Sequence, residues 1–154
     1  MTYNLSDECR VKEKMQIMQA NIEQVDALCT MDKEIVGDFS RKEMIITAIK
    51  EKRCLVQGTH RGIAGFLIYT TNFFECSFIS LIIVKPSERR KGVATSLLAH
   101  FVHMAPTLKI FSSTNQSNLH MQKVFELAGF KRSGYIENLD DGDPEIIYFK
   151  SQVD

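Results

Sequence analysis

The sequence predicts a mixed α/β fold, in which strands and helices are arranged around one sheet. Three runs rich in β-branched and aromatic residues occupy the middle of the chain, at residues 54–57, 63–71 and 77–84. Apolar residues recur at helical spacing before and after these runs. The 154 residues suit one compact domain, and no repeat or linker divides them. We therefore expect a single domain over residues 1–154, with a core from about 10 to 150.

The part before the middle runs is expected to form a strand and two helices. Residues 11–18 loosely alternate, which predicts a first strand. Asn21, followed three residues later by Gln24, indicates a helix start. The apolar stripe of that helix is expected to be Ile22, Val25, Leu28 and Cys29. Ser40 and Glu43 fit a capping box that opens a second helix. Its inward residues are expected to be Met44, Ile45, Ala48 and Ile49.

Short connections join the three middle runs. Residues 58–62, Gly-Thr-His-Arg-Gly, predict a hairpin loop between the first two, and residues 72–76 separate the second from the third. The third run, residues 77–84, is almost wholly apolar, as expected of a central strand that is covered on both faces. Pro86 ends it.

Beyond Pro86 the pattern predicts a helix, a strand and a second helix. A helical stripe comprises Val93, Leu97, Leu98 and Phe101. Residues 109–113 are typical of a strand. Asn118 then precedes a helix whose stripe comprises Met121, Val124, Phe125 and Ala128. Gly129 is expected to be its left-handed C-cap, with Phe130 placed for the apolar contact that accompanies such a cap.

Two closing strands are predicted near residues 132–137 and 145–150, on either side of residues 138–144. Carboxylates crowd this connection and the strand start after it: Asp140, Asp141, Asp143 and Glu145. One interpretation is a cluster that attracts a cationic amine. The other is a solvated turn shaped by Gly142 and Pro144.

Charge and cysteine content argue against several classes of protein. Nineteen basic and nineteen acidic side chains cancel, so no net field recruits nucleic acid or an anionic membrane. The four cysteines never form a CxxC pair, which favours reduced thiols over zinc or disulfides. His100 and His103 lack an evident third ligand, so we expect no metal site. Without a signal-like start or an apolar run of about 18 residues, the chain is expected to be cytoplasmic.

The most informative stretch is residues 81–98, which combine a buried strand, a proline, a basic turn, one glycine and an amphipathic helix. A helix start offers unpaired N–H groups and a positive dipole end, which suit a phosphate. Gly92 permits close approach to the backbone, and Arg89, Arg90 and Lys91 add positive charge. The stretch lacks the extra glycines of a P-loop or a dinucleotide fingerprint. A plain surface turn is the alternative.

Val84-Lys-Pro86 followed by Arg89-Arg-Lys-Gly92-Val-Ala94 closely resembles the acetyl-coenzyme A signature of the GCN5-related N-acetyltransferase (GNAT) superfamily. That signature reads Arg or Gln, two residues, Gly, one residue, then Gly or Ala. Downstream, Asn118 and the helix that ends in Gly129-Phe130 resemble the family's second cofactor-contacting segment. The order of elements fits the whole fold.

The resemblance implies a strongly bent mixed sheet of six to seven strands, flanked by about four helices, whose fourth and fifth strands splay apart. Acetyl-coenzyme A would bind in the gap as the acyl donor, with its pantetheine arm on the main chain of Ile82, Ile83 and Val84. Its pyrophosphate would lie on the backbone of Arg90, Lys91, Gly92, Val93, Ala94 and Thr95. Arg89, Asn118 and Phe125 would add contacts. The Val84 N–H would polarise the thioester carbonyl, and an amine would attack directly in a ternary complex.

Two proton-transfer residues of the family are replaced in this chain. Many members carry a tyrosine four residues before Gly-Phe, where this chain has Phe125. Relatives that acetylate ribosomal proteins carry a glutamate five residues before the conserved asparagine, where Ser113 stands. An alkylamine with a pKa near about 10.4 still needs a base at neutral pH. Glu75 is the candidate, with a solvated turn carboxylate as the alternative. Tyr135 and Tyr148 are candidate proton donors, and packing is their alternative role.

We therefore expect an acetyl-coenzyme A-dependent N-acetyltransferase that acts on a small-molecule primary amine. A peptide or protein N-terminus is the alternative acceptor. Phe125 and Ser113 also leave open a non-catalytic acetyl-coenzyme A sensor. A nucleic-acid-binding role for residues 89–91 is disfavoured by the zero net charge. The resemblance leaves a homodimer open.

Overall fold

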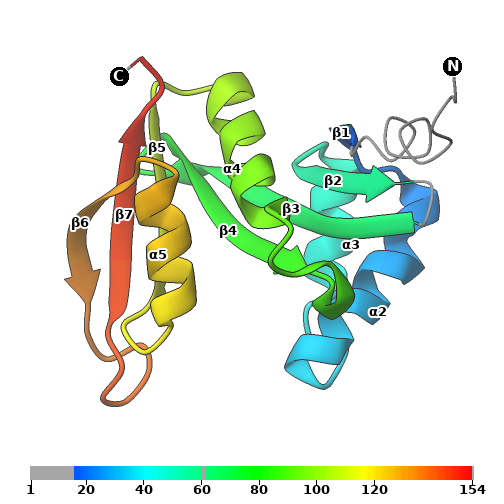
Figure 1. Cartoon of the computed structure of the whole chain (residues 1–154), viewed down its shortest axis with the longest axis horizontal. Coiled ribbons are helices and arrows are strands. Elements are labelled where there is room, and N and C mark those ends of the chain that lie inside the picture. The colour runs from blue at the N-terminus through cyan, green and yellow to red at the C-terminus, as the bar shows by residue number, and fades with distance from the viewer. Residues whose placement is uncertain (1–15, 60–61, 154) are drawn as a thin grey trace, which may run out of the picture.

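The computed structural model describes residues 16–59 and 62–153 (Figure 1). The strands are β1 (Gln16–Gln19), β2 (Cys54–Thr59), β3 (Gly62–Phe73), β4 (Cys76–Val84), β5 (Lys109–Asn115), β6 (Lys131–Ile136) and β7 (Glu145–Ser151). The α-helices are α2 (Val25–Val36), α3 (Lys42–Lys50), α4 (Val93–Met104) and α5 (Leu119–Leu127). Two 3-10 turns, η1 (Ile22–Gln24) and η2 (Pro86–Glu88), precede α2 and follow β4. The mixed α/β fold that the sequence predicts is confirmed.

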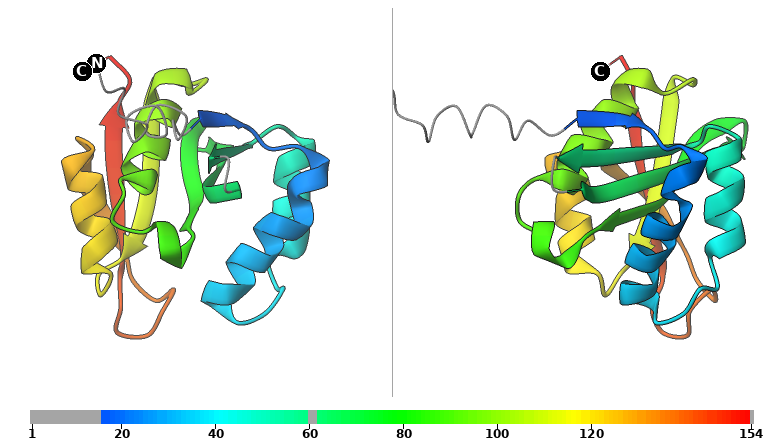
Figure 2. Two further views of the ribbon diagram at one scale, coloured as in Figure 1. Left: turned by 45° about the vertical axis from the view of Figure 1, so that its right-hand side comes forward. Right: turned by 90° about the vertical axis from the view of Figure 1, so that its right-hand side faces the viewer.

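The seven strands form one sheet in the order β1-β2-β3-β4-β5-β7-β6. Every neighbouring pair is antiparallel except β4 and β5, which run parallel. Helices α2 and α3 cover one face of the first half of the sheet, and α4 and α5 cover the opposite face (Figure 2). Among the described residues, no helix is long and apolar enough to cross a membrane.

Two apolar clusters fill the space between the helices and the sheet. The cluster under α4 and α5 centres on Leu97, Leu98, Phe101, Phe125 and Tyr148. The cluster under α2 and α3 centres on Leu28, Ile45, Phe66 and Ile68. Strand β4 contributes Ile79 to the first and Leu81 and Ile83 to the second, because a register shift between β3 and β4 separates Ile79 from Leu81. The prediction of a central strand covered on both faces is confirmed.

Strands β4 and β5 stay together only briefly. Ser77, Phe78 and Ile79 pair with Ile110, Phe111 and Ser112, and no further pair joins the two strands. Residues 80–84 of β4 and 113–115 of β5 therefore continue without each other. The splay between the fourth and fifth strands, which the resemblance implies, is present.

The first helices agree with the sequence in part. Asn21 and Gln24 form a reciprocal capping box at the predicted helix start, but it opens η1 rather than α2 itself. The tighter turn takes Ile22 off the stripe of α2, and its side chain is 54% exposed, so its predicted burial was wrong. Residues 11–15 of the predicted first strand lie outside the described residues, whereas β1 confirms the remainder.

The start of α3 differs from the prediction. The Ser40–Glu43 capping box does not form: Arg41 is the N-cap residue, without a side-chain cap, and the Ser40 N–H donates to Asp38. The Arg41 guanidinium instead bonds both carboxylate oxygens of buried Asp32 in α2, which ties the two helices together. Ile45, Ala48 and Ile49 are buried as predicted, but Met44 lies beside that stripe and is exposed.

The second half of the chain follows its predictions closely. Helix α4 buries the four expected residues, and Asn118 caps α5 by accepting from the Met121 N–H at 3.1 Å. Gly129 is left-handed at φ +88°, and the Phe130 N–H bonds the Phe125 carbonyl at 2.9 Å, as expected of the predicted cap. Both closing strands are present as β6 and β7. Strands β2 and β3 also pair as a hairpin, although residues 60–61 of its loop are not described.

We predict that Gly65→Ala destabilises the protein where α4 meets the sheet. A Cβ at this position would lie 2.7 Å from the Ile83 carbonyl oxygen and 2.8 Å from Val93 Cγ1. Overpacking of this kind costs about 1–3 kcal/mol, which urea unfolding measures. Gly58→Ala is the matched control in the neighbouring strand, because among the described residues its Cβ would meet only the Gly62 carbonyl oxygen, at 3.5 Å. Equal stability of the two variants would contradict the prediction.

Candidate active site

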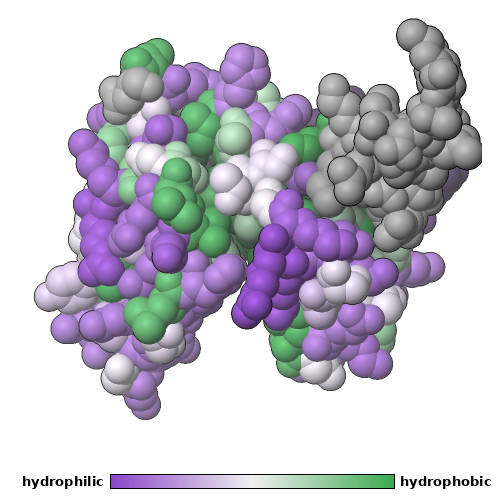
Figure 3. Space-filling model, in the orientation of Figure 1, coloured by the Kyte–Doolittle hydropathy of each residue, from purple (hydrophilic) through white to green (hydrophobic). Residues whose placement is uncertain are grey.

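A cavity of about 770 Å³ opens between the end of β4 and the starts of α4 and α5. We call it the β4–α4 cavity. Figure 3 shows the surface hollowed between the part of the molecule that carries α5 and the part that carries the turn after β4. Its wall is formed by Ile35, Ile82, Ile83, Val84, Glu88, Arg89, Arg90, Gly92, Val93, Ala94, Thr95, Asn118, His120, Met121 and Val124.

The start of α4 has the features of an anion site and lies at the wall of this cavity. Gly92 is its N-cap residue, held at φ +79°, and it has no side chain with which to cap the helix. The first intrahelical bond to it comes from the Ser96 N–H, so helix geometry leaves the N–H groups of residues 93–95 without intrahelical acceptors. Arg90 is also left-handed, at φ +64°. Backbone N–H groups and the positive end of the helix dipole therefore meet at the cavity wall.

Charged side chains near this start are divided between the cavity and the surface. Arg89 and Arg90 line the cavity and are exposed. Lys91 lies outside the wall, where its Nζ bonds the Glu88 carboxylate at 3.2 Å. His120, at the start of α5, faces the same space. The cavity thus offers cationic side chains beside the helix start, which suits a group with several negative charges.

The end of β4 supplies an unpaired strand edge to the cavity. Residues 82–84 pair with β3 on one side, but β5 has already parted from them on the other. Main-chain groups that point toward the gap are therefore available to a ligand with amide groups, which can pair with them as another strand would.

Ten of the twelve predicted cofactor residues line the cavity: Ile82, Ile83, Val84, Arg89, Arg90, Gly92, Val93, Ala94, Thr95 and Asn118. Lys91 and Phe125 do not. Phe125 is 1% exposed and packs in the core against Phe130 and Tyr148, with ring centroids 5.5 and 4.9 Å away. Sequence analysis did not assign Ile35, Glu88, His120, Met121 and Val124 to this site. The last two belong to the recognised stripe of α5, but nothing in the local pattern indicates that Ile35 of α2 reaches the cavity.

Glu75, the candidate base, lies away from the cavity. It is exposed in the tight turn between β3 and β4, at φ +65°. Val84 is at the opposite end of β4, roughly 30 Å away along the strand. The structure therefore does not bring Glu75 to the unpaired edge of β4, and its surroundings are those of a solvated turn carboxylate.

The two tyrosines are also placed by the fold. Tyr135 is 64% exposed on β6, the edge strand of the sheet. Tyr148 is fully buried, stacks on Phe125, and its hydroxyl has no hydrogen-bond partner among the described residues. Neither side chain lines the β4–α4 cavity.

Ser113 holds a carboxylate from the neighbouring strand. Its hydroxyl donates to Glu145 Oε1 at 2.7 Å. The preceding residue, Ser112, donates its buried hydroxyl to the Ile79 carbonyl at 2.9 Å, which ties β5 to β4 at their last pair. A glutamate side chain therefore does lie beside Ser113, although it comes from β7.

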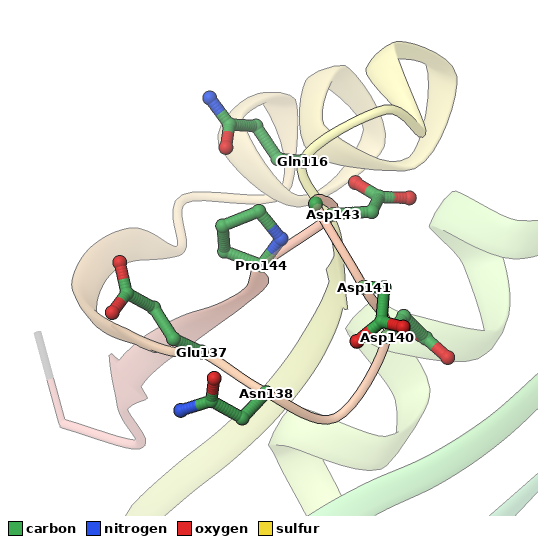
Figure 4. A pocket seen from close by; sticks show the side chains of 8 residues that line it. Gln116, Glu137, Asn138, Asp140, Asp141, Asp143 and Pro144 are labelled. Carbon is green, nitrogen blue, oxygen red and sulfur yellow. The ribbon is translucent and has the colours of Figure 1, made fainter.

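The acidic loop, residues 138–144, surrounds a second cavity of about 340 Å³ (Figure 4). Two of its carboxylates accept hydrogen bonds from the end of β5 and from the segment that follows it. Asp143 accepts from both the N–H and the hydroxyl of Ser117, and Asp140 accepts from Asn115 Nδ2 at 2.9 Å. The loop is thus fixed against the end of β5, while Asp141 remains exposed.

The described part of the chain gives little evidence for a cysteine nucleophile or for a metal site. Burial raises the pKa of the Cys29 thiol, and burial raises that of Cys54 to about 12, so both stay protonated at neutral pH. Cys76 sits beside the β3–β4 turn, with Glu75. His100 and His103 are exposed on α4, and residues 16–59 and 62–153 contain no group of three His, Cys, Asp or Glu side chains that could hold a metal.

Comparison with known proteins decides the family. The model of the Acetyltransferase (GNAT) family matches residues 19–130. The chain belongs to the GNAT family. A GNAT-family acetyltransferase from Bacillus cereus ATCC 10987 is 48% identical, with a TM-score of 0.88 over 92% of this chain and 99% of that chain. None of the curated proteins matches significantly.

Two more distant GNAT structures share the fold. The ribosomal-protein-S18-alanine N-acetyltransferase of Escherichia coli is 16% identical, with a TM-score of 0.77 over 90% of this chain and 94% of that one. yncA of Salmonella typhimurium, solved with acetyl-CoA, is 11% identical, with a TM-score of 0.74 over the same shares. The family uses acetyl-CoA as its acyl donor, and this GNAT protein is an acetyltransferase.

Gly92→Val is predicted to weaken acetyl-CoA binding at least about tenfold. A β-branched residue at positive φ is strained by about 1–3 kcal/mol, and relief of that strain would turn the first N–H groups of α4 away from the cavity. Isothermal titration with acetyl-CoA measures the effect. Gly142→Val is the matched control, because Gly142 has a similar φ of +72° and equally open surroundings but lies in the acidic loop. An affinity equal to that of the wild type in Gly92→Val would contradict the assignment.

Proposed function

We propose that this GNAT protein transfers the acetyl group of acetyl-CoA to a primary amine of a small molecule, by direct attack in a ternary complex. The observation that carries the proposal is the β4–α4 cavity, in which an uncapped helix start adjoins an unpaired strand edge. The two features match the two halves of the donor, because coenzyme A carries a pyrophosphate and a pantetheine arm with two amides.

In the proposed complex each part of acetyl-CoA has its own partners. The pyrophosphate accepts from the backbone of residues 92–95, with Arg89 and Arg90 beside it. The pantetheine amides pair with the edge of residues 82–84. The Val84 N–H donates to the thioester oxygen, whose negative charge grows as the amine attacks. Main-chain groups thus perform most of the recognition.

The positions and pKa values of the described cysteine thiols are consistent with direct transfer from acetyl-CoA to the amine. An acyl-enzyme on cysteine needs a thiolate at the cavity, but Cys29 and Cys54 are buried with raised pKa values and Cys76 lies at the far end of β4. The amine itself is therefore the nucleophile in the proposal. Its nitrogen forms the new C–N bond while the C–S bond to coenzyme A breaks.

The acidic loop supports a cationic acceptor. Asp141 is exposed there, and Glu137 lines the same second cavity, so the loop attracts positive charge to the end of β5. This observation favours an amine that is protonated in solution. The Escherichia coli structure is that of a ribosomal-protein-S18-alanine N-acetyltransferase, and a peptide amine is therefore tested beside small amines.

Saturating acetyl-CoA should raise the melting temperature, and an amine should then release thiol. A ligand at a hundredfold its dissociation constant stabilises by about 2.7 kcal/mol, or roughly 5–10 °C for a chain of this size. The panel comprises spermidine, benzylamine and a tetrapeptide with a free N-terminal alanine. Turnover of spermidine or benzylamine above the peptide supports the small-molecule acceptor, and faster turnover of the peptide would reject it. A temperature shift without thiol release from any of the three would favour a sensor role.

No covalent acetyl adduct should accumulate when the enzyme is incubated with acetyl-CoA alone, because attack by the amine is the only acyl transfer in the proposal. Intact-protein mass spectrometry checks this. The Cys76→Ser variant should also retain the wild-type rate of thiol release. An adduct that disappears on addition of amine would replace direct attack with a two-step mechanism.

A further inference from the structure

Glu145 has the environment of a carboxylate that is positioned but not neutralised. It begins β7, its side chain is half-buried, and Oε1 accepts from Ser113 Oγ at 2.7 Å. No Lys, Arg or His of the described residues forms an ion pair with it, and Oε2 has no hydrogen-bond donor among them. A half-buried carboxylate without a cation retains its attraction for a positively charged ligand.

The strand register places this carboxylate on a particular face of the sheet. Ser113 pairs with Ile147 and Asn115 with Glu145, so these four side chains share one face. Ile146 and Tyr148, which alternate with them, pack under α4 and α5. Glu145 therefore lies on the opposite face, the one that α2 and α3 cover in the other half of the sheet.

The carboxylate also stands at the point where β4 and β5 part. Ser112 makes the last pair with β4, so Ser113, the residue that holds Glu145, is the first of β5 beyond it. The β4–α4 cavity reaches this side of the sheet, because Ile35 of α2 and Ile83 belong to its wall. Acetyl-CoA is proposed to bind at the start of α4 and the edge of β4. Glu145 lies on the β5 side of the same gap.

The other carboxylates in this part of the molecule already have a hydrogen-bond or ion-pair partner, or are exposed on the acidic loop. Glu88 is paired with Lys91, and Asp140 and Asp143 hold the acidic loop against β5 and the segment that follows it. Asp141 is exposed on that loop, away from the strand. Glu145 alone combines a fixed position on a strand with a free carboxylate oxygen, within the described part of the chain.

We propose that Glu145 binds the ammonium group of the acceptor and takes its proton, and that Ser113 is the positioning residue that holds the carboxylate in place. This rests on the proposed function. The ammonium gives one proton to Glu145, and the neutral nitrogen attacks the thioester carbon. The C–S bond then breaks and coenzyme A leaves as the thiolate. The second nitrogen proton goes to that thiolate or to water, and Glu145 returns its proton to water.

The ionisable side chains at the end of β6 and in the acidic loop are acidic apart from Tyr135, whereas Lys131 and Arg132 of β6 pair farther along β7. The end of β6, which pairs with the start of β7, carries Tyr135 and is followed by Glu137. The acidic loop carries Asp140, Asp141 and Asp143. No basic side chain of these segments competes with an incoming ammonium, which gives the acceptor side a charge opposite to that of the pyrophosphate side.

The test compares Glu145→Gln with wild type, using whichever of spermidine, benzylamine and the alanine tetrapeptide releases thiol fastest. Glutamine keeps the acceptor for Ser113 but cannot take a proton, so the fold should be retained. We expect kcat/KM for the amine at pH 7 to fall about 10²–10⁴-fold. The deficit should shrink toward pH 10, where the amine is already neutral. The affinity for acetyl-CoA and the melting temperature should stay at their wild-type values.

Three further variants sharpen the comparison. Ser113→Ala should lose part of the rate, and Ser113→Thr, which keeps the hydroxyl, should recover it. Glu75→Gln is the matched control, an exposed carboxylate at the far end of β4, and should keep the wild-type pH profile. A Glu145→Gln rate equal to wild type, or lowered equally at every pH, would overturn the inference while the proposed function stands. Wild-type protein that releases no thiol with any of the three amines would overturn both.

Discussion

The separation of β4 from β5 after three parallel pairs is the constraint on which the rest of the structure depends. Unpaired backbone groups inside a sheet are costly unless a ligand or water satisfies them. Here they face the β4–α4 cavity, where residues 82–84 line the wall and remain available to a donor with amide groups. Ser112 fixes the point of separation through its buried bond to the Ile79 carbonyl. Because the pairing of β4 with β5 ends early, backbone groups of β4 remain available to a long ligand.

Close packing of α4 against the sheet brings the start of this helix to the unpaired edge of β4. Gly65 lets the start of α4 approach β3 and β4, since any side chain there would collide with Ile83 or Val93. Gly92 then begins α4 without a capping side chain, so the helix start keeps free N–H groups that an N-cap side chain satisfies in many other helices. Two glycines thus serve different needs, one for packing and one for backbone conformation. Together they place the positive end of a helix beside an unpaired strand.

Side chains of opposite charge lie on different sides of the gap between β4 and β5. Cationic side chains and helix N–H groups gather on the side of α4, with Arg89 and Arg90. Carboxylates gather where β7 begins, beyond the acidic loop that Asp140 and Asp143 fasten to β5 and its continuation. Such a division suits an acetyltransferase of the GNAT family, which must bring an anionic donor and an amine together from different directions. Electrostatic complementarity of this kind favours encounter as well as binding.

Local sequence determined the elements and half of the site. Helical spacing identified the buried side of α4, Asn21 and Asn118 identified helix starts, and the Arg89–Ala94 signature identified the residues at the β4–α4 cavity wall, because each depends on residues only a few positions apart. The acceptor side depends on pairing across the sheet. Ser113 meets Glu145 over a separation of 32 residues only because β7 inserts beside β5, and Glu75 is remote only because it precedes β4, at the other end of that strand from Val84. Strand order and register are set by packing of the whole sheet, so these placements were decided by the tertiary structure.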